Sequence, residues 1–471
     1  MQASLFLLVA ALVLRSGGVA PPWPLDSDHP WLLLAIVVGG TLGAPLLAGA
    51  AGFLPWNRRG ADAEGSWSRR LRRMRWTQTF VCAVTAGAIA GLGWLDLVRR
   101  TVGDLILVDE ALALLPAICG MLLVWWVLHP AAHMPHRGEP PPGRLRAVVD
   151  LARLQFPLLL VPVALVIAAQ ESAIRGAAWL GLPAELLATV AAIAALLAAP
   201  GLMILALDTA PLPQDEAGES VRQVFRAAGV RVAGLRVWRT GGAMMNGMAV
   251  GLVPWCRWVL LTDLLMQCLP ARGVMAVAAH EAGHLRQRHM LWLAAALVGG
   301  MGCAAVAVSG LVETVWPPEG PLPAWVEAAG TAAAVVVGAG IFGAVSRRCE
   351  RQADAFAVQV LSGGADAVVT EDAVQSMRRA LAVVAMTNGI PPGRRSFRHG
   401  SIRSRRERLE RLTGLPCRRI PIDREMRMVK LVVAAMAAAS LAAAWLESAP
   451  VPGPPATCSA DAAALSMMRS R

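Results

Sequence analysis

The chain has 471 residues, of which 56% are hydrophobic and only 16% are charged. A soluble enzyme of this length needs more polar surface than that, so the mean hydropathy of +0.53 excludes an ordinary soluble protein. The net charge of +12 would suit nucleic acid. Because no basic–aromatic binding module is present, however, we expect no nucleic-acid partner. The apolar residues gather in long blocks, which predicts a protein that crosses the bilayer several times.

The first 207 residues are predicted to form an N-terminal transmembrane region with five or six spans. Its first apolar run, Leu5 to Leu14, is ended by Arg15. This run fits either a signal-like segment or a short first span, and the sequence leaves both open. Clearer apolar blocks follow at about 31–56, 77–97, 111–128, 155–173 and 179–206.

The second half of the chain alternates between polar and apolar stretches. We expect one domain over residues 208–427, interrupted by two spans at about 291–314 and 324–345. A last span is expected at 428–446. The remaining residues, 447–471, are rich in proline and alanine and are expected to be disordered.

Positive charge is distributed unevenly over the loops between these blocks. Arginine-rich stretches alternate with short loops that carry few positive charges, and basic loops tend to stay in the cytoplasm. Both large polar stretches of the second half are therefore expected to face the cytoplasm. The basic stretches are 57–76, 129–154 and 346–427, and the others are 98–110, 174–178 and 315–323.

The stretch "AVAAHEAGHLRQRHMLWLAAALVGG" contains the pattern H-E-x-x-H at His280, Glu281 and His284. On a helix, residues four apart share a face, so both imidazoles point to one spot. Two imidazoles suit zinc, and Glu281, one step round the helix, is placed to activate a bound water. Ala282 and Gly283 leave space for a close neighbour. The alternative is a surface helix with two histidines by chance.

A second polar stretch, "SRRCERQADAFAV" (346–358), follows the span predicted at 324–345. Glu350 and Asp354 are four apart and share a helix face. Glu350 can supply a third zinc ligand, and Asp354 can hold a ligand imidazole by a hydrogen bond from outside the ligand set. The alternative is an ordinary charged helix. Together the two stretches predict one zinc ion per chain, held by His280, His284 and Glu350.

These two motifs resemble those of the membrane-embedded zinc metalloproteases of the HtpX heat-shock protease and type I CaaX protease family. The stretch "NGMAVGLVPWCRWVLLTDLL" (246–265) is similar to the Asn-containing strand pair of that family. The stretch "RHGSIRSRRERLERL" (398–412) is similar to its late His-Pro-Pro-x-x-x-Arg segment. Gly400 and Ser401 replace both prolines here. The resemblance covers roughly residues 214–412.

The resemblance implies a mainly α fold: a polytopic helical membrane bundle with a small α/β, gluzincin-like protease domain at the cytoplasmic face, here within 208–427. It implies that His399 is catalytic, and that Arg405 and Asn246 bind substrate. For His399 and Arg405, the alternative is a basic loop near lipid headgroups. For Asn246, an exposed strand edge and an Asn-Gly turn both remain open.

The remaining histidines are expected to stay outside the metal site. His289 lies five residues after His284, so on a continuous helix it points away from the metal face. We expect that helix to run on into the span near Leu291, which places the site at the membrane surface. Prolines break the helix that would align a second histidine cluster. This cluster consists of His129, His133 and His136.

The sequence thus predicts an integral-membrane zinc endopeptidase, in which Glu281 assists attack by a zinc-bound water on peptide bonds. Its expected partners are the lipid bilayer and peptide or protein substrates that are membrane-associated or misfolded. Its expected place is a bacterial inner (plasma) membrane, with the site facing the cytoplasm. One alternative is a sensor-type metalloprotease that cleaves a regulator. Another is a transporter or scaffold with a relic site, for which Asp96 and Glu171 near span ends are candidates.

Overall fold

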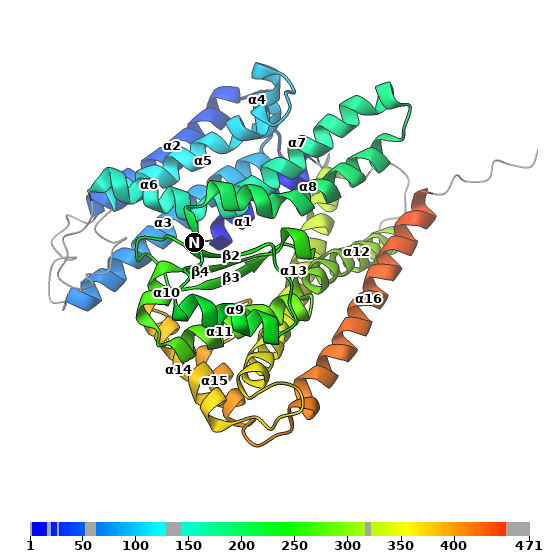
Figure 1. Ribbon diagram of the computed structural model, residues 1–471. Coiled ribbons are helices and arrows are strands. Elements are labelled where there is room, and N and C mark those ends of the chain that lie inside the picture. Colours follow the sequence, from blue (N-terminus) through cyan, green and yellow to red (C-terminus); the bar gives the residue numbers. More distant parts are fainter. Residues whose placement is uncertain are drawn as a thin grey trace, which may run out of the picture.

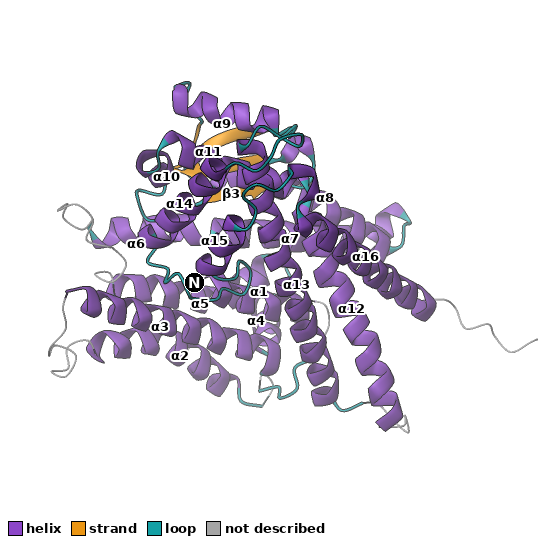
Figure 2. Ribbon diagram, turned by 90° about the horizontal axis from the view of Figure 1, so that it is seen from below, coloured by secondary structure: helices purple, strands orange, loops and turns teal. Residues whose placement is uncertain are grey.

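The computed structural model describes residues 2–16, 20–25, 28–51, 63–128, 143–315 and 322–448. Helices dominate these residues, and one small sheet lies among them (Figures 1 and 2). The predicted fold class, a mainly α membrane bundle with a small α/β part, is confirmed. The histidines at 129, 133 and 136, and all but the first two residues of the predicted tail, lie outside the described residues.

Seven helices in the described part of the chain are long and apolar enough to cross a membrane, as an integral membrane protein requires. They coincide with seven of the apolar blocks of the sequence. The eighth block, near 77–97, is a pair of helices bent by 73° at Gly93. The seven are α2 (Pro30–Ala50), α5 (Val108–Val127), α7 (Pro157–Leu180), α8 (Ala184–Ala206), α12 (His289–Val315), most of α13 (Ala324–Leu361) and most of α16 (Pro421–Ser448).

Two arginine-rich stretches that the sequence suggested were loops are partly helical. The helix α3 (Ala63–Gly91) begins inside the stretch 57–76, and α6 (Arg144–Gln155) begins inside 129–154. Arginine is a good helix former, so a run of arginines marks the side of the membrane without excluding a helix. α4 (Trp94–Val102) completes the bent pair with α3.

The first helix, α1 (Gln2–Ser16), packs inside the N-terminal bundle. Leu5, Leu8 and Leu12 are almost completely buried, and they belong to one core with residues of α3 and α5. Arg15 at its end forms an ion pair with Asp96 of α4. The apolar run that the sequence left undecided therefore contributes to the bundle.

The sheet has the strand order β1-β2-β4-β3, which leaves β3 (Gly247–Val250) at an edge. β2 (Gly234–Trp238) and β4 (Trp258–Thr262) are parallel, whereas β1 (Thr209–Pro211) and β3 pair antiparallel with their neighbours. Figure 1 shows α9 (Glu216–Ala227) and α11 (Ala271–Arg286) on one side of the sheet. The N-terminal bundle covers the other side (Figure 1).

Short helices complete the domain around the sheet. α10 (Asp263–Cys268) follows β4, and α14 (Glu371–Thr387) packs on α11. α15 (Ile402–Glu410) packs on α13 and α14. Two single turns of 3-10 helix are η4 (Pro254–Cys256) and η5 (Cys417–Arg419).

Two large apolar cores hold the molecule together. One lies in the N-terminal bundle, and the other joins the sheet domain to α12, α13 and α16. A third, small cluster links the end of α8 to the sheet through Ile204, Leu207, Trp238 and Leu260. This arrangement places one end of each of the last three spanning helices next to α11, which contains the H-E-x-x-H pattern.

Candidate metal centre

The three predicted metal ligands meet between α11 and α13. The Nε2 atoms of His280 and His284 are 3.2 Å apart. The Glu350 carboxylate lies 3.6 Å from each of them, Oε2 from His280 and Oε1 from His284. Tetrahedral zinc, with bonds of about 2.0–2.1 Å, needs ligand atoms about 3.4 Å apart. The donor set and its spacing therefore fit a zinc ion, and one ligand atom from each residue lies within 4.8 Å of the others.

Gly283 explains how α13 comes close enough for Glu350 to reach the histidines. A Cβ atom at this position would lie 3.2 Å from Cα of Ala353 and 3.2 Å from the ring of Phe356. The two helices therefore touch where α11 has no side chain. The helix α13 is therefore the close neighbour for which Ala282 and Gly283 leave space.

Asp354 lies one turn beyond Glu350 and contacts the first histidine. Its Oδ1 is 3.0 Å from Nδ1 of His280, the ring nitrogen that faces away from the ligand cluster. Arg405 donates to both carboxylate oxygens of Asp354, at 2.8 Å from Nε and 2.6 Å from Nη2. Its Nη1 lies 3.1 Å from Oε2 of Glu350. Arg405 thus ties the two carboxylates of α13 together.

The segment before Arg405 shows why serine and glycine replace the two prolines. Gly400 has a φ of +71°, which proline cannot adopt because its ring fixes φ near −65°. Ser401 is the N-cap of α15, and its Oγ accepts from the backbone N–H of Ser404 at 3.2 Å. The cap fixes the start of the helix that carries Arg405.

His399 reaches the ligand cluster from the loop before α15. Its Nδ1 lies 2.8 Å from Oε1 of Glu350, and its side chain is 50% exposed. Among the side chains that contact Glu350, only His399 has such exposure within the described structure, since those of His280, His284 and Arg405 are at most 19% exposed. His399 therefore lies where the ligand cluster opens toward the surroundings.

Glu281 is buried between α11 and the edge strand β3. Gly247, the first residue of β3, faces it closely: a Cβ atom there would lie 3.2 Å from Cγ and 3.2 Å from Oε1 of Glu281. Asn246 immediately precedes β3, and its backbone exchanges hydrogen bonds with Thr262 of β4. Asn246 therefore lies at the start of an edge strand and not in a two-residue turn.

Asn388, a residue that no sequence pattern indicated, holds the start of the same strand from a distant segment. Its side-chain Oδ1 accepts from the backbone N–H of Met245 at 3.0 Å, and its Nδ2 donates to the Met245 carbonyl at 2.7 Å. The Asn388 side-chain amide thus pairs with the Met245 backbone in the way that a residue of a neighbouring strand would. Because 143 residues separate the partners, no local pattern could have revealed the contact.

Burial and neighbouring charges shift the ionisation of the site. Burial raises the pKa of the Glu281 carboxyl, although the charge of His280 acts against it. Burial lowers the pKa of His284 well below its usual value, which keeps this imidazole neutral. For His280, burial lowers the pKa, but contacts with Asp354 and Glu350 outweigh burial and raise it to about 10.

His289 lies beside the ligand cluster, so the expectation that it points away from the site is wrong. Its Nδ1 is 3.0 Å from Nδ1 of His284. The expected continuous helix is also wrong: α11 ends at Arg286, and α12 begins at His289. Arg288 between them has a φ of +55°, in the left-handed region that interrupts a helix. The break redirects the chain, so the spacing of five no longer sets the direction of His289.

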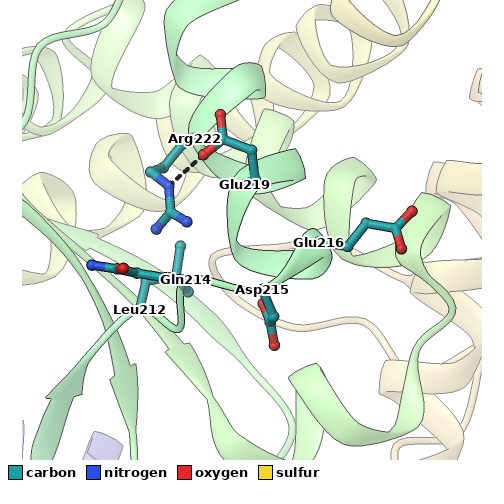
Figure 3. Close-up of a pocket in the computed structure, with 6 residues that line it drawn as sticks. All are labelled: Leu212, Gln214, Asp215, Glu216, Glu219 and Arg222. Carbon is teal, nitrogen blue, oxygen red and sulfur yellow. Dashed lines mark hydrogen bonds and ion pairs between the residues drawn. The ribbon is translucent and has the colours of Figure 1, made fainter.

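An open pocket elsewhere on the domain is separate from this centre. Figure 3 shows it beside the start of α9, where Glu219 and Arg222 form an ion pair. Asp215, another lining residue, caps the helix by accepting from the Gly218 N–H at 2.7 Å. None of the predicted site residues lines this pocket, whose lining is Leu212, Gln214, Asp215, Glu216, Glu219 and Arg222.

Comparisons with known proteins bear on the same region. Residues 212–413 match the family described as Peptidase family M48. Seven chains among solved structures are similar to this one. One is the crystal structure of S. mikatae Ste24p, with a TM-score of 0.46 and 15% sequence identity, covering 80% of this chain and 99% of that chain. No curated protein matches the chain.

The fold and the site together define a polytopic membrane protein with a metallopeptidase domain. Residues 212–413, which hold every predicted site residue, match the model of peptidase family M48. The resemblance to membrane metalloproteases of the HtpX and type I CaaX type is thereby confirmed.

Proposed function

We propose that this protein is a zinc-dependent endopeptidase that cleaves membrane-associated or misfolded proteins at the membrane surface. The observation that carries the proposal is the grouping of His280, His284 and Glu350 at zinc spacing, with the Glu281 carboxylate beside them. A zinc ion held there would polarise the peptide carbonyl and make water acidic enough to react near neutral pH.

The residues of the chain have separate roles in this proposal. Glu281 takes a proton from the attacking water on its carboxylate and passes it to the leaving amine. Its raised pKa supports this exchange, because a base works best when its pKa is near the working pH. His399, exposed at the opening of the cluster, donates from its ring to the substrate carbonyl as negative charge develops.

Arg405 is proposed to act through the carboxylates of α13. Its guanidinium already donates to Asp354 and contacts Glu350, and its side chain is only 9% exposed. This geometry favours a positioning role over direct substrate contact. Asp354 in turn is placed to orient His280, because its Oδ1 lies 3.0 Å from Nδ1, which leaves Nε2 for the metal.

The edge strand β3 supplies a surface on which a substrate can bind in extended form. Among the described residues it has no strand neighbour on its outer side, and it lies against α11 next to Glu281. A peptide added along this edge would be held by main-chain hydrogen bonds, which tolerate many sequences. Asn246, at the start of the strand, would contact one end of that peptide.

The alternative of a transporter with a relic site is not favoured by its two candidate charges. Asp96 forms an ion pair with Arg15, and the Glu171 carboxylate accepts from the backbone N–H of Leu107 at 2.9 Å. Both carboxylates thus stabilise contacts within the N-terminal bundle. The alternating loop charges support a site in the cytoplasm, and we place the protein in a bacterial inner membrane.

The decisive experiment compares the purified full chain with the Glu281→Gln variant. Zinc content and cleavage of casein or of a membrane substrate are measured for both. We expect about one zinc ion per chain in each, and a loss of at least about 100-fold in kcat for Glu281→Gln, because the proton acceptor is gone. Equal activity of the two proteins would refute the mechanism.

A further inference from the structure

A line of four polar side chains leads away from the candidate metal centre. The Nδ1 of His289 lies 3.0 Å from the Nδ1 of His284, and His289 is completely buried. The other ring nitrogen of His289, Nε2, lies 3.0 Å from Oε1 of Gln352. The Gln352 amide then donates from Nε2 to Oδ1 of Asp423 at 2.7 Å. Hydrogen bonds therefore connect a metal ligand to the start of α16 without a gap.

Hydrogen-bond chemistry gives this line one direction. When His284 binds metal through Nε2, its proton is on Nδ1, so Nδ1 donates and Nδ1 of His289 accepts. His289 then carries its own proton on Nε2 and donates to the Gln352 carbonyl oxygen. That leaves the Gln352 NH2 group to donate to Asp423, which accepts as a carboxylate. Every step pairs one donor with one acceptor.

We propose that His289 is a positioning residue, which with Gln352 and Asp423 holds His284 in the tautomer and orientation that present Nε2 to the metal. The inference rests on the proposed zinc site and adds to it. It assigns His289 as the partner of the His284 imidazole, just as Asp354 contacts the imidazole of His280. Ligand histidines commonly need such partners, and their loss typically weakens metal binding 10- to 100-fold.

The line also connects the centre to the membrane. His289 begins α12, Gln352 lies in α13, and Asp423 lies in the first turn of α16. The cytoplasmic ends of three spanning helices thus meet behind one ligand, and α12 packs along both of the others. The orientation of His284 therefore depends on how these three helices are packed.

The test measures zinc affinity of the purified full chain after removal of metal, by competition with a chromophoric chelator. His289→Phe keeps a ring of similar size but has no hydrogen-bonding atoms, so we expect zinc binding to weaken about 10- to 100-fold. His289→Gln can accept from His284 and donate to Gln352, so it should recover most of the affinity. His29→Phe is the matched control: it changes an exposed histidine just before the apolar helix α2, and should leave zinc affinity unchanged.

Two further measurements separate positioning from folding. With excess chelator, His289→Phe should unfold at the temperature of the wild-type protein, but zinc should raise its midpoint less. The visible absorption of the cobalt-loaded protein should change in His289→Phe and return in His289→Gln, because it reports ligand geometry. If His289→Phe does not fold, Asp423→Leu tests the half-buried end of the line, with Asp423→Asn, which keeps an acceptor, as its control.

The outcomes distinguish this inference from the proposed function. A wild-type protein that binds no zinc would refute the zinc site itself. A wild-type protein that binds zinc tightly, together with His289→Phe and Asp423→Leu variants within twofold of it, would refute only the positioning role. Weaker zinc binding in Asp423→Asn, which keeps an acceptor, than in Asp423→Leu, which does not, would also overturn the proposed direction of the hydrogen bonds.

Discussion

At the scale of single residues, the centre depends on one buried pair of opposite charges. Asp354 and Arg405 are 5% and 9% exposed, and two hydrogen bonds join them. A buried charge that loses its partner is costly, because the remaining charge is neither solvated nor neutralised. The pair therefore stabilises the domain as well as orienting His280.

We predict that Asp354→Ala lowers the free energy of unfolding by about 3–5 kcal/mol. It should also weaken zinc binding about 10- to 100-fold, because the His280 ring loses its partner. Thermal unfolding and chelator competition measure the two effects. Asp366→Ala is the control, since it breaks an exposed pair with Arg418 and should change neither quantity. An Asp354→Ala variant with normal zinc affinity would contradict the orienting role.

A substitution at Gly247 should impair catalysis without affecting metal binding. In Gly247→Ala the new methyl group would press on Val277, at 2.8 Å, and on the Glu281 side chain. We expect kcat to fall at least about tenfold while one zinc ion per chain remains bound, since a displacement of about 1 Å at a reacting group is costly. Gly201→Ala, where a Cβ atom meets nothing within 4 Å, is the control. Loss of zinc in Gly247→Ala would refute this separation.

Much of the centre could be predicted from residue spacing. The pairs His280–His284 and Glu350–Asp354 lie four apart on helices, so the sequence alone indicated which side chains share a face. Their meeting across 66 residues was inferred because the two stretches together supply a complete zinc ligand set, and the resemblance to a family agreed with it. His289 and Asn388 were missed because their partners depend on a helix break and on a contact between distant segments.

At the scale of elements, the approach of α11 to α13 decides whether the third ligand reaches the histidines. Gly283 lies at this contact, against the backbone of Ala353. A larger side chain there must push the two helices apart, because backbone atoms cannot move aside as a flexible side chain can.

We therefore predict that Gly283→Val weakens zinc binding more than tenfold, by moving Glu350 away from both imidazoles. Zinc affinity from chelator competition is the measurement. Gly340→Ala changes a glycine of α13 that has open space beside it and should leave the affinity unchanged. Normal zinc binding by Gly283→Val would show that the helix contact does not control the site.

The break between α11 and α12 could not be predicted from the periodic spacing of residues. The sequence from Ala271 to Val315 contains no proline or glycine at the break, so a continuous helix was the natural expectation. Arg288 adopts a left-handed conformation there, which local sequence preferences disfavour and tertiary packing enforces. α6 has a different cause: the charge of its stretch indicated a loop, although arginine is a good helix former.

At the scale of the whole molecule, two large cores are joined by a small one. The N-terminal bundle has its own buried residues, whereas the candidate centre belongs to the core of the sheet domain and the last three spans. Only a few buried residues link the end of α8 to the sheet. The two cores can therefore respond differently to metal.

We predict two unfolding transitions in calorimetry, of which only one shifts when zinc is removed. Zinc at 100 times its dissociation constant adds about 2.7 kcal/mol to the part that binds it. Chelation should therefore lower the transition of the sheet domain and leave that of the N-terminal bundle in place. The Glu350→Gln variant, which lacks a ligand, should show the lower transition even with zinc present. A single transition that shifts as a whole would contradict the independence of the two cores.

The sequence indicated the approximate place of the spans because about 20 consecutive apolar residues are hard to accommodate elsewhere. Its eight clear apolar blocks correspond to seven single helices and one bent pair among the described residues. It could not predict that α13 is one unbroken helix of 38 residues. At 1.5 Å per residue, this helix is about 57 Å long, nearly twice the hydrocarbon thickness of about 30 Å. Roughly half of it therefore extends beyond the lipid, and Glu350 lies on that half.

The length of α13 amplifies any tilt of this helix. A bilayer that becomes thinner or thicker changes the tilt of a spanning helix, and a small rotation within the lipid becomes a larger sideways displacement at the protruding end. His280 and His284 lie on α11, which packs against this protruding half at Gly283. A displacement of that half would therefore act on the whole cluster of candidate ligands.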